Sequence, residues 1–461
     1  MAEISVPSAR SEWRVSEARI LTPDRLFDEP PNMALDRIRF LETLGRLVAL
    51  GERLQNSVDA GKVPKESLAA QVVIDRLAPA VARGALRVEQ ICAPETPDRP
   101  NLVVTLPGQS TETLGFIGAH FDVVPADRVA EGWTTPPFEL VVEPDGTLRG
   151  RGVTDCLGHV ALLTELLCDL VAEGVTPSRT LVVVLISNEE ESSVPGIGLD
   201  YVAAQGGLDG LAGGPVIWLD SADFGPTLGT GGIAAWELVA TGVPGHSGMP
   251  HNCVNALELA MVAALELSKW FSNSYPPHPD EARWNYASSS SLKSTVIDVD
   301  NQKVTKIPGR AMVRGDIRMT PFYDIDEAVE RARSFVESLD VRIQNAAPGD
   351  PLSRFRTVSG EVGHLRFMPK EQRTRGVACA LSSPAQRALS AAISEIAGKE
   401  RLRPYSMTGS LPLVSDLAAR GIDVQITGFG RGIGYHAPNE SAHLTDFEAG
   451  YGILRRLAEV L

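Results

Sequence analysis

Positive charge is scarce in this sequence. Lys and Arg number 43 against 58 Asp and Glu, so the formal net charge at neutral pH is −15. A chain of this charge repels phosphate backbones and anionic membrane surfaces, and no stretch concentrates Lys and Arg enough to reverse the repulsion locally. The charge balance therefore argues against nucleic acid or a membrane surface as a partner.

Cysteine and long hydrophobic runs are also scarce. The five cysteines are scattered and form no CxxC pair of the kind that binds zinc or carries out redox chemistry. The first residues, MAEISVPSARSEWRV, lack the basic start and apolar run of a signal peptide. No run of about 18 apolar residues follows that could span a membrane. We therefore expect free thiols, a reducing compartment and a cytoplasmic location.

The length of 461 residues exceeds one ordinary compact core, so two or three domains are expected. The first part of the chain has the pattern of a layered α/β domain. Helical spacing of apolar residues predicts helices over 35–57, 64–84 and 159–174. Three runs rich in β-branched residues predict buried strands: LGFIGAHFDVV (114–124), TLVVVLISNEE (180–190) and GPVIWLDS (214–221).

From about residue 231 the pattern changes to strand-like segments that alternate with helices over 252–271 and 325–339. This favours a smaller α+β sandwich inserted into the first domain. A stretch rich in Pro, Gly and charge (346–378) leads into a helix over 383–397. A strand over 422–430 and a helix over 445–460 then complete the first domain.

Acidic and His residues follow several of the predicted strands, where a strand end can hold a side chain rigidly in a cleft. His120 and Asp122 alternate in GAHFDVV, so both cannot ligate one ion from the same strand face without a bend. The simpler interpretation makes His120 a metal ligand and Asp122 the carboxylate that orients its ring.

Asp155 lies in the glycine-rich turn GRGVTDCLGH, which leaves a carboxylate exposed before a helix. The alternative is that Asp155 is only the N-cap of that helix, beginning near residue 157. Glu189, Glu190 and Glu191 end an apolar strand, and adjacent carboxylates there repel one another unless cations neutralise them. A solvated loop is the alternative for this acidic run.

Asp220, after VIWL, and His436, in GYHAPNE, add two further positions of the same kind. Carboxylate ligands combined with two imidazoles suit zinc, cobalt or manganese, and a bridging carboxylate allows two ions to share one site. The residues thus favour a site for a pair of divalent metal ions.

Taken in order, these segments resemble the zinc-dependent metallopeptidase superfamily that contains acetylornithine deacetylases, aminoacylases, succinyl-diaminopimelate desuccinylases and carnosinase-type dipeptidases. The resemblance implies an α/β fold of the phosphorylase/hydrolase-like zinc exopeptidase class. It implies a catalytic domain built from residues 1–230 and 379–461, with an inserted α+β lid, used for dimerisation, over 231–378. The matching motifs, spread over residues 118 to 440, are GAHFDVVPA, WTTPPF, GRGVTDCLGH, NEE, WLD, GHSGMPHNCVNAL, GDIRMTP and YHAPNE.

The resemblance also assigns metal ligands. His120 and Asp220 would hold one ion, Glu190 and His436 the other, and Asp155 would bridge the two. The implied cofactor is a pair of divalent ions, zinc in the first instance, with cobalt or manganese as alternatives.

Glu189 would be the general base by the same resemblance, with Asp122 orienting His120. The run of three glutamates leaves the register open, because Glu190 and Glu191 could take the roles of Glu189 and Glu190. We prefer Glu189 as base and Glu190 as ligand, since these two follow the strand directly.

Further residues are implied outside the metal site. His246 in GHSGMP matches a lid histidine that, in dimeric relatives, reaches the partner subunit's active site and stabilises the oxyanion, although an isolated imidazole is more often a surface residue. Arg318 in GDIRMTP resembles the residue that binds the substrate carboxylate, and a salt bridge with Asp316 explains it equally well. Gly409 and Ser410 are further candidates for substrate binding. A homodimer is implied.

Within the superfamily, TDCLGHVALLTEL, LGTGGIAAWEL and YSMTGSLPLVSDL look most like the acetylornithine deacetylases of the plant and eukaryotic type. This implies a hydrolase of linear amides that releases acetate and L-ornithine from N2-acetyl-L-ornithine, a step of arginine biosynthesis. A carnosinase-type metallodipeptidase or another N-acyl-amino-acid deacylase is the alternative, because these share the metal site. A catalytically silent homologue would be expected to lack a ligand or the base, and here all are present.

Overall fold

The computed structural model of the chain describes residues 34–191, 194–301, 303–411 and 413–461. The N-terminal segment, from which no signal peptide is predicted, lies outside these residues. Within them, no helix is long and apolar enough to cross a membrane, and all five cysteines are free thiols.

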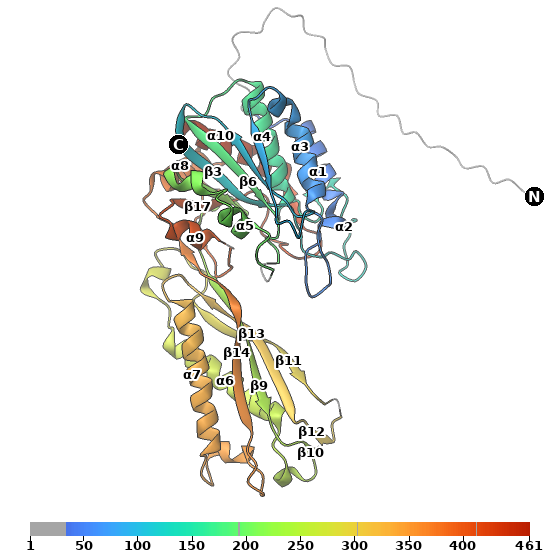
Figure 1. Cartoon of the computed structure of the whole chain (residues 1–461), viewed down its shortest axis with the longest axis vertical. Helices are drawn as coiled ribbons and strands as arrows, with labels where there is room; N and C mark the ends of the chain where they lie inside the picture. The colour runs from blue at the N-terminus through green and yellow to red at the C-terminus, as the bar shows by residue number, and fades with distance from the viewer. Residues whose placement is uncertain (1–33, 192–193, 302, 412) are drawn as a thin grey trace, which may run out of the picture. The chain divides into compact units, whose positions relative to one another are not determined.

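A mixed sheet of nine strands forms the centre of the first lobe, which comprises residues 34–230 and 377–461 (Figure 1). Alternate side chains of each strand enter two separate cores: Val183 and Leu185 face one core, and Val182 and Val184 face the other. A strand buried on both faces reads as a continuous apolar run, which is why the pattern predicted these strands. Their spatial order is β1 (Arg87–Ile91), β2 (Asn101–Leu106), β6 (Arg179–Ile186), β3 (Ser110–His120), β7 (Val216–Leu219), β17 (Val424–Thr427), β8 (Thr227–Thr230) and β15 (Val377–Ala378), with β16 (Tyr405–Ser406) paired to β8.

Helices cover both faces of this sheet, which makes the first lobe a three-layer structure. The larger core lies against α1 (Arg37–Val48), α3 (Ser67–Ala82), α4 (Leu157–Ala172), α8 (Pro384–Ala392) and α10 (Leu444–Val460). The smaller core lies against α5 (Leu199–Ala204), η1 (Asp209–Gly213) and α9 (Val414–Ala419). The short helices α2 (Gly51–Leu54) and η5 (Ile393–Ala397), and a small sheet of β18 (Ser441–His443), β5 (Thr147–Arg149) and β4 (Val141–Val142), complete the lobe.

The helix predicted over 35–57 is divided in the structure. The first helix ends at Val48, and the second begins at Gly51, where a Cβ atom would lie 2.4 Å from the Phe138 ring. The close approach of Phe138 therefore requires glycine at this point. Strands β1 and β2 were not predicted from the sequence.

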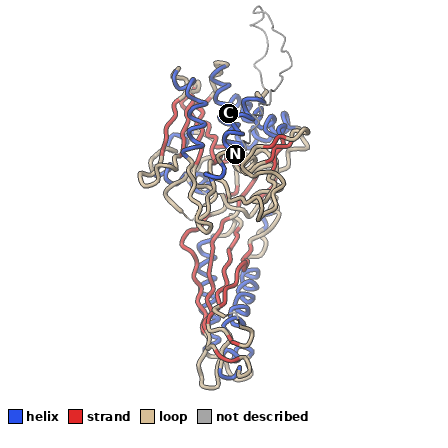
Figure 2. The backbone as a smooth tube through the Cα atoms, turned by 90° about the vertical axis from the view of Figure 1, so that its right-hand side faces the viewer, coloured by secondary structure: helices blue, strands red, loops and turns tan. Residues whose placement is uncertain are grey.

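The inserted lobe (residues 232–374) is a four-stranded antiparallel sheet covered by two helices, as Figure 2 shows from the side. The sheet order is β11 (Ser291–Val299), β13 (Arg310–Met319), β9 (Gly232–Thr241) and β14 (His364–Thr374), and the helices are α6 (Ala256–Ser274) and α7 (Ile325–Gln344). Shorter elements are β10 (Gly245–His246), β12 (Lys306–Ile307), η2 (Pro250–Asn252), η3 (Pro279–Glu281) and η4 (Pro351–Phe355). The chain leaves the large sheet after Thr230 and rejoins it at Val377, while the domain boundaries at 230 and 378 stay a prediction.

Strand β14 lies in the Pro-, Gly- and charge-rich stretch from which no strand is predicted. It is an edge strand in which Leu365 and Phe367 are buried while their neighbours His364 and Arg366 are exposed. Pro369 precedes an irregularity in its pairing with β9. Edge strands and bulges tolerate proline and charge, so the composition of this segment does not indicate a strand.

Candidate metal centre

The strand ends that carry acidic and His residues are neighbours in the sheet. Strand β3 pairs in parallel with β6 on one side and with β7 on the other. The carboxyl ends of parallel strands meet at one edge, so His120, Glu189 and Asp220 come from three adjacent strands to the same place. Asp155 joins them from the turn before α4, and His436 from the loop between β17 and β18.

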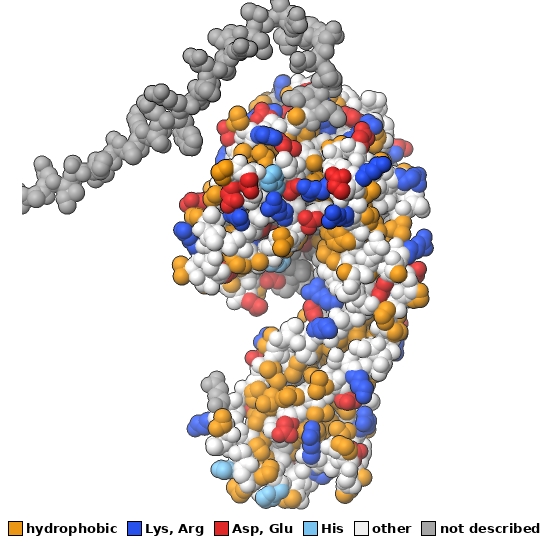
Figure 3. All heavy atoms as spheres, turned by 180° about the vertical axis from the view of Figure 1, so that it is seen from behind, with side chains coloured by type: hydrophobic (Ala, Val, Ile, Leu, Met, Phe, Trp, Pro, Cys, Tyr) orange, Lys and Arg blue, Asp and Glu red, His pale blue; other side chains and the backbone are white. Residues whose placement is uncertain are grey.

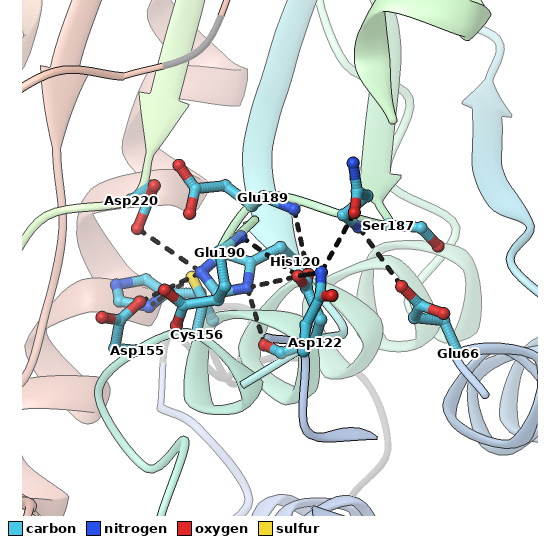
Figure 4. Close-up of polar contacts among 12 residues, drawn as sticks. Glu66, His120, Asp122, Asp155, Cys156, Ser187, Glu189, Glu190 and Asp220 are labelled. Carbon is cyan, nitrogen blue, oxygen red and sulfur yellow. Dashed lines mark hydrogen bonds and ion pairs between the residues drawn. The ribbon is translucent and has the colours of Figure 1, made fainter. Parts of the chain in front are cut away.

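Four predicted metal ligands contact one another through Asp155 and His436. Figure 4 labels three of them, His120, Asp155 and Glu190. His120 Nε2 lies 3.0 Å from Asp155 Oδ1, and His436 Nε2 lies 3.2 Å from Asp155 Oδ2. His436 Nε2 also lies 3.1 Å from Glu190 Oε2. The two oxygens of Asp155 therefore face two different imidazoles, which is the arrangement required of a bridging carboxylate.

Asp220 joins the cluster on the His120 side, with its Oδ1 3.8 Å from His120 Nε2. The five predicted ligands thus divide into His120 with Asp220 and His436 with Glu190, and Asp155 lies between the two pairs. Glu191 points elsewhere: its Oε2 accepts a hydrogen bond from Val58 N at 3.1 Å.

Asp155 does not cap α4. The helix begins at Leu157 and its N-cap residue is Cys156, so the capping alternative is wrong. The turn that presents Asp155 is held instead by Glu440, whose side chain is completely buried. Glu440 accepts hydrogen bonds from the backbone N–H of Asp155 at 3.0 Å and of Thr154 at 2.9 Å, and from Arg151 Nη1 at 2.9 Å.

Asp122 contacts both His120 and the glutamate loop. His120 Nδ1 donates to the main-chain oxygen of Asp122 at 2.9 Å, and the Asp122 carboxylate lies 3.5 Å away. The same carboxylate accepts from the backbone N–H of Glu189 at 3.1 Å and of Glu190 at 3.0 Å. Asp122 therefore fixes the position of the glutamate loop as well as the ring of His120.

The ionisation of the cluster reflects crowding of acids in a buried place. Burial first, then repulsion from Asp220, raises the pKa of Glu189 well above its ordinary value. Burial and repulsion from Asp155 raise the pKa of Glu190 to about 7. Asp155 is the exception, because hydrogen bonds from His120 and His436 outweigh burial and lower its pKa.

The donor set fits a pair of divalent cations. Glu190 Oε1 is buried and has no hydrogen-bond partner among the described residues, which costs free energy unless something else occupies it. His120, Asp155 and Glu190 offer ligand atoms within 4.8 Å of one another. Cations would satisfy the orphaned oxygen and remove the repulsion among the carboxylates.

Three contributors were missed from the sequence. The Cys156 thiol lies in a second group of possible ligand atoms with His120 and Asp220. Glu440 lies in the YHAPNE motif, which predicts no role for it, and nothing in the sequence points to Asn56, although its Nδ2 donates to Asp122 Oδ2 at 2.8 Å. An isolated Asn or Glu carries no local signal of such a contact, since its partner lies far away in the sequence.

The remaining predicted residues lie outside the cluster. Arg318 is on β13, opposite Ile233 of β9, and its Nε donates to Asp316 at 2.8 Å. The salt-bridge alternative is therefore present in the structure. Gly409 accepts a hydrogen bond from Gly231 N at 2.7 Å, and Ser410, which follows it, is partly exposed.

His246 is exposed on β10, which follows the end of β9 that lies farther from the first lobe's sheet. Ten residues of β9, at about 3.3 Å per residue, place that end about 30 Å along the sheet from Gly232. His246 Nδ1 accepts a hydrogen bond from Gly248 N at 2.9 Å, a contact within its own turn.

His159, which lies in a predicted motif without an assigned role, is a core residue. Its Nδ1 contacts Thr154 O at 3.1 Å, and its Nε2 accepts from Phe429 N at 2.8 Å, so the ring is held in its neutral form. Burial lowers the pKa of His159 to about 4.

Because the folded pKa of His159 lies below the unfolded value, this contribution to stability is present at neutral pH and is lost as pH falls from about 6.5 towards 4. Between pH 7 and pH 5 we expect the loss to be about 2 kcal/mol. Urea unfolding of metal-free protein at the two pH values measures it, with His159→Gln as the comparison. An equal pH dependence in both proteins would contradict this role.

Comparison with known proteins places this site in a family. The sequence profile of the peptidase family M20/M25/M40 matches residues 116–460, which include every residue of the cluster. The chain belongs to this family. The chain is therefore a hydrolase of linear amides, from a family that works with divalent metal ions.

Two relatives match this M20/M25/M40 member over nearly its full length. It is 40% identical to the acetylornithine deacetylase of Dictyostelium discoideum over 441 residues, which cover 93% of this chain and 97% of the relative. It is 37% identical to the acetylornithine deacetylase of Arabidopsis thaliana, covering 93% and 96%. In structure it resembles an M20 family metallo-carboxypeptidase from Sulfolobus solfataricus, with a TM-score of 0.66, 16% identity, and coverage of 91% of this chain and 98% of the other. The structural likeness supports the fold alone.

Proposed function

We propose that this protein hydrolyses N2-acetyl-L-ornithine to acetate and L-ornithine, a step of arginine biosynthesis in the cytoplasm. The observation that carries the proposal is the complete cluster around Asp155 in a chain that matches two acetylornithine deacetylases over 93% of its length. A full set of ligands and a base argues for catalysis rather than for a binding module.

Two divalent ions, zinc in the first instance, would be held by His120 with Asp220 and by Glu190 with His436. Asp155 would bridge them. When bound, such ions activate a water molecule and polarise the acyl carbonyl.

Glu189 is proposed as the general base. Glu189 comes shortly after the end of β6, beside the cluster. Its backbone N–H donates a hydrogen bond to the Asp122 carboxylate. As general base, the Glu189 carboxylate would take a proton from the attacking water. It then returns this proton to the amine nitrogen of ornithine as the amide bond breaks.

Arg318 and the loop with Gly409 and Ser410 are proposed to hold the substrate's α-carboxylate. Arg318 lies at the end of β13 that pairs with the start of β9, and Gly409 is bonded to Gly231 just before β9. Both therefore lie where the chain passes between the two sheets. A guanidinium that already pairs with Asp316 can bind a second carboxylate through its remaining N–H groups.

We also propose a homodimer formed through the inserted lobe. Strand β11 is an edge of its sheet, and apolar side chains beside it are exposed: Met261 52%, Leu265 69%, Val296 41% and Ile297 48%. Figure 3 shows hydrophobic side chains gathered on a face of this lobe. The edge of a sheet beside an exposed apolar surface is suited to a second copy of the same chain.

The dimer would give His246 a role. Because His246 lies about 30 Å along the sheet from Gly232, its imidazole is suited to reach the metal centre of a second copy rather than its own. There it would donate a hydrogen bond to the oxyanion that develops on the acyl carbonyl.

Replacing Ile297 with Glu is expected to give a monomer of 49.4 kDa by sedimentation and to lower kcat at least 10-fold, because the oxyanion donor is lost. Ile38→Glu, at a 71% exposed position on α1 of the first lobe, is the control for added charge. Separately, His246→Ala should keep the dimer and lower kcat by about 100-fold. A fully active I297E monomer would exclude the role of His246 across subunits.

The substrate is tested by assaying N2-acetyl-L-ornithine beside other N-acetyl amino acids, N-succinyl amino acids and dipeptides such as carnosine. The proposal predicts the highest kcat/KM for N2-acetyl-L-ornithine. Faster turnover of dipeptides, with little deacetylation, would replace it by the metallodipeptidase function.

A further inference from the structure

The glutamates of the metal centre are carried by a loop whose first residue has an unusual backbone conformation. Asn188 lies between the end of β6 and Glu189, and its φ is 60°. Few residues other than glycine adopt this left-handed region, and asparagine is among those that tolerate it. The direction in which the chain leaves β6, and so the position of Glu189 and Glu190, depends on this residue.

The Asn188 side chain is buried, with 8% exposure, and both its oxygen and its nitrogen form hydrogen bonds. Its Oδ1 accepts from Asn56 Nδ2 and from Arg99 Nη2, each at 3.0 Å. Its Nδ2 donates to Val194 O at 2.7 Å, which closes the glutamate loop at its far end. One side chain thus ties both ends of the loop to the body of the lobe.

The partners of Asn188 are themselves fixed. Arg99 forms a buried ion pair with Glu66 at 2.6 Å, the two side chains being 5% and 0% exposed. Glu66 Oε1 also accepts from the backbone N–H of Asn188 at 3.3 Å. An ion pair with all these hydrogen bonds made is rigid, because any shift would leave a buried charge without a partner.

Asn56 links this network to the centre. Its Nδ2 donates both to Asn188 and to Asp122 Oδ2, at 3.0 and 2.8 Å. In the view of Figure 4, Glu66 lies beyond Asp122 on the side away from Asp155 and Asp220. Hydrogen bonds therefore run without a break from Glu66 and Arg99, through Asn188 and Asn56, to Asp122.

We propose that Asn188 is a positioning residue for amide hydrolysis, with Asn56 and the Arg99–Glu66 pair as its support. This inference rests on the proposed roles of Glu189 as base and Glu190 as ligand. The network fixes the positions of these two carboxylates, and it contacts neither substrate nor metal. Small displacements of a catalytic group are costly: a misplacement of about 1 Å can lower the rate by about 100-fold.

Asn188→Gly is the informative variant, because glycine adopts the same φ without strain and removes only the side-chain hydrogen bonds. The expected result is a 10- to 100-fold lower kcat with KM changed by less than about threefold, and two metal ions still bound. The visible spectrum of the cobalt-substituted protein should shift as well, since Glu190 is displaced. Asn285→Gly is the matched control: Asn285 also has a positive φ of 55°, and its side chain bonds to Pro404 O, which is not a residue of the cluster.

A kcat within twofold of wild type together with an unchanged cobalt spectrum would overturn the inference. Loss of activity fully accounted for by lost metal or unfolded protein would also overturn it, because that is a general structural role. If N188G does not give soluble protein, Asn56→Ala tests the same link with the same readouts. Failure of the proposed function is a different outcome, since wild-type protein would then hydrolyse none of the N-acyl amino acids.

Discussion

Replacing Glu189 with Gln is expected to lower kcat for amide hydrolysis by about 10²- to 10⁴-fold, the usual contribution of a general base. The amide of Gln has nearly the same size but cannot take the proton of the attacking water. Metal content should stay at the wild-type level, because the cluster contacts run through Glu190, Asp155 and the two imidazoles. Steady-state kinetics combined with metal analysis of the same samples measures both effects.

Glu191→Gln is the matched control for this prediction. Glu191 is the next residue in the run, and its carboxylate bonds to Val58 N rather than to the cluster. Its replacement should change kcat by no more than a few-fold. Near-normal turnover in E189Q with a large loss in E191Q would mean that the general base is a later glutamate of the loop and not Glu189.

Asp155→Asn is expected to abolish measurable turnover and to lower the bound metal from two ions to one or none. The reason is that Asp155 offers one oxygen to the His120 side and the other to the His436 side, so both ions lose a ligand. In wild-type protein, removal of the ions with a chelator should lower Tm, because buried carboxylates then repel one another. The Tm of D155N should respond much less to the chelator, as one of these charges is already absent.

Metal analysis and thermal unfolding with and without chelator check the role of Asp155. Asp145→Asn is the control, since Asp145 is in a surface turn where it bonds to Thr147 N. Two tightly bound ions in D155N would exclude Asp155 as the shared ligand.

The sheet edge that carries the centre could be predicted from the sequence because parallel strands order their carboxyl ends. Once LGFIGAH, VVVLISNEE and VIWLD are recognised as neighbouring buried strands, His120, the glutamates and Asp220 must meet. Asp155 and His436 lie on loops that strand order does not place, and the resemblance assigned their roles as bridge and ligand. Their contacts at 3.0 to 3.2 Å agree with the predicted cluster, while the roles of the individual residues stay proposals.

The support around the centre could not be predicted in this way. Asn56 and Asn188 are 132 residues apart, and Arg99 and Asn188 are 89 apart, so no spacing rule connects them. The left-handed conformation of Asn188 is visible only in the backbone. Strand β14 could not be predicted for a different reason. One exposed face and an edge position give it the composition of a loop.

Titration of metal-free protein with zinc, while hydrolysis of N2-acetyl-L-ornithine is followed, tests the central claim most directly. The account predicts that activity is absent without metal, rises as ions are added and reaches its maximum at two ions per chain. Full activity in metal-free protein, or no hydrolysis of this substrate with two ions bound, would contradict it.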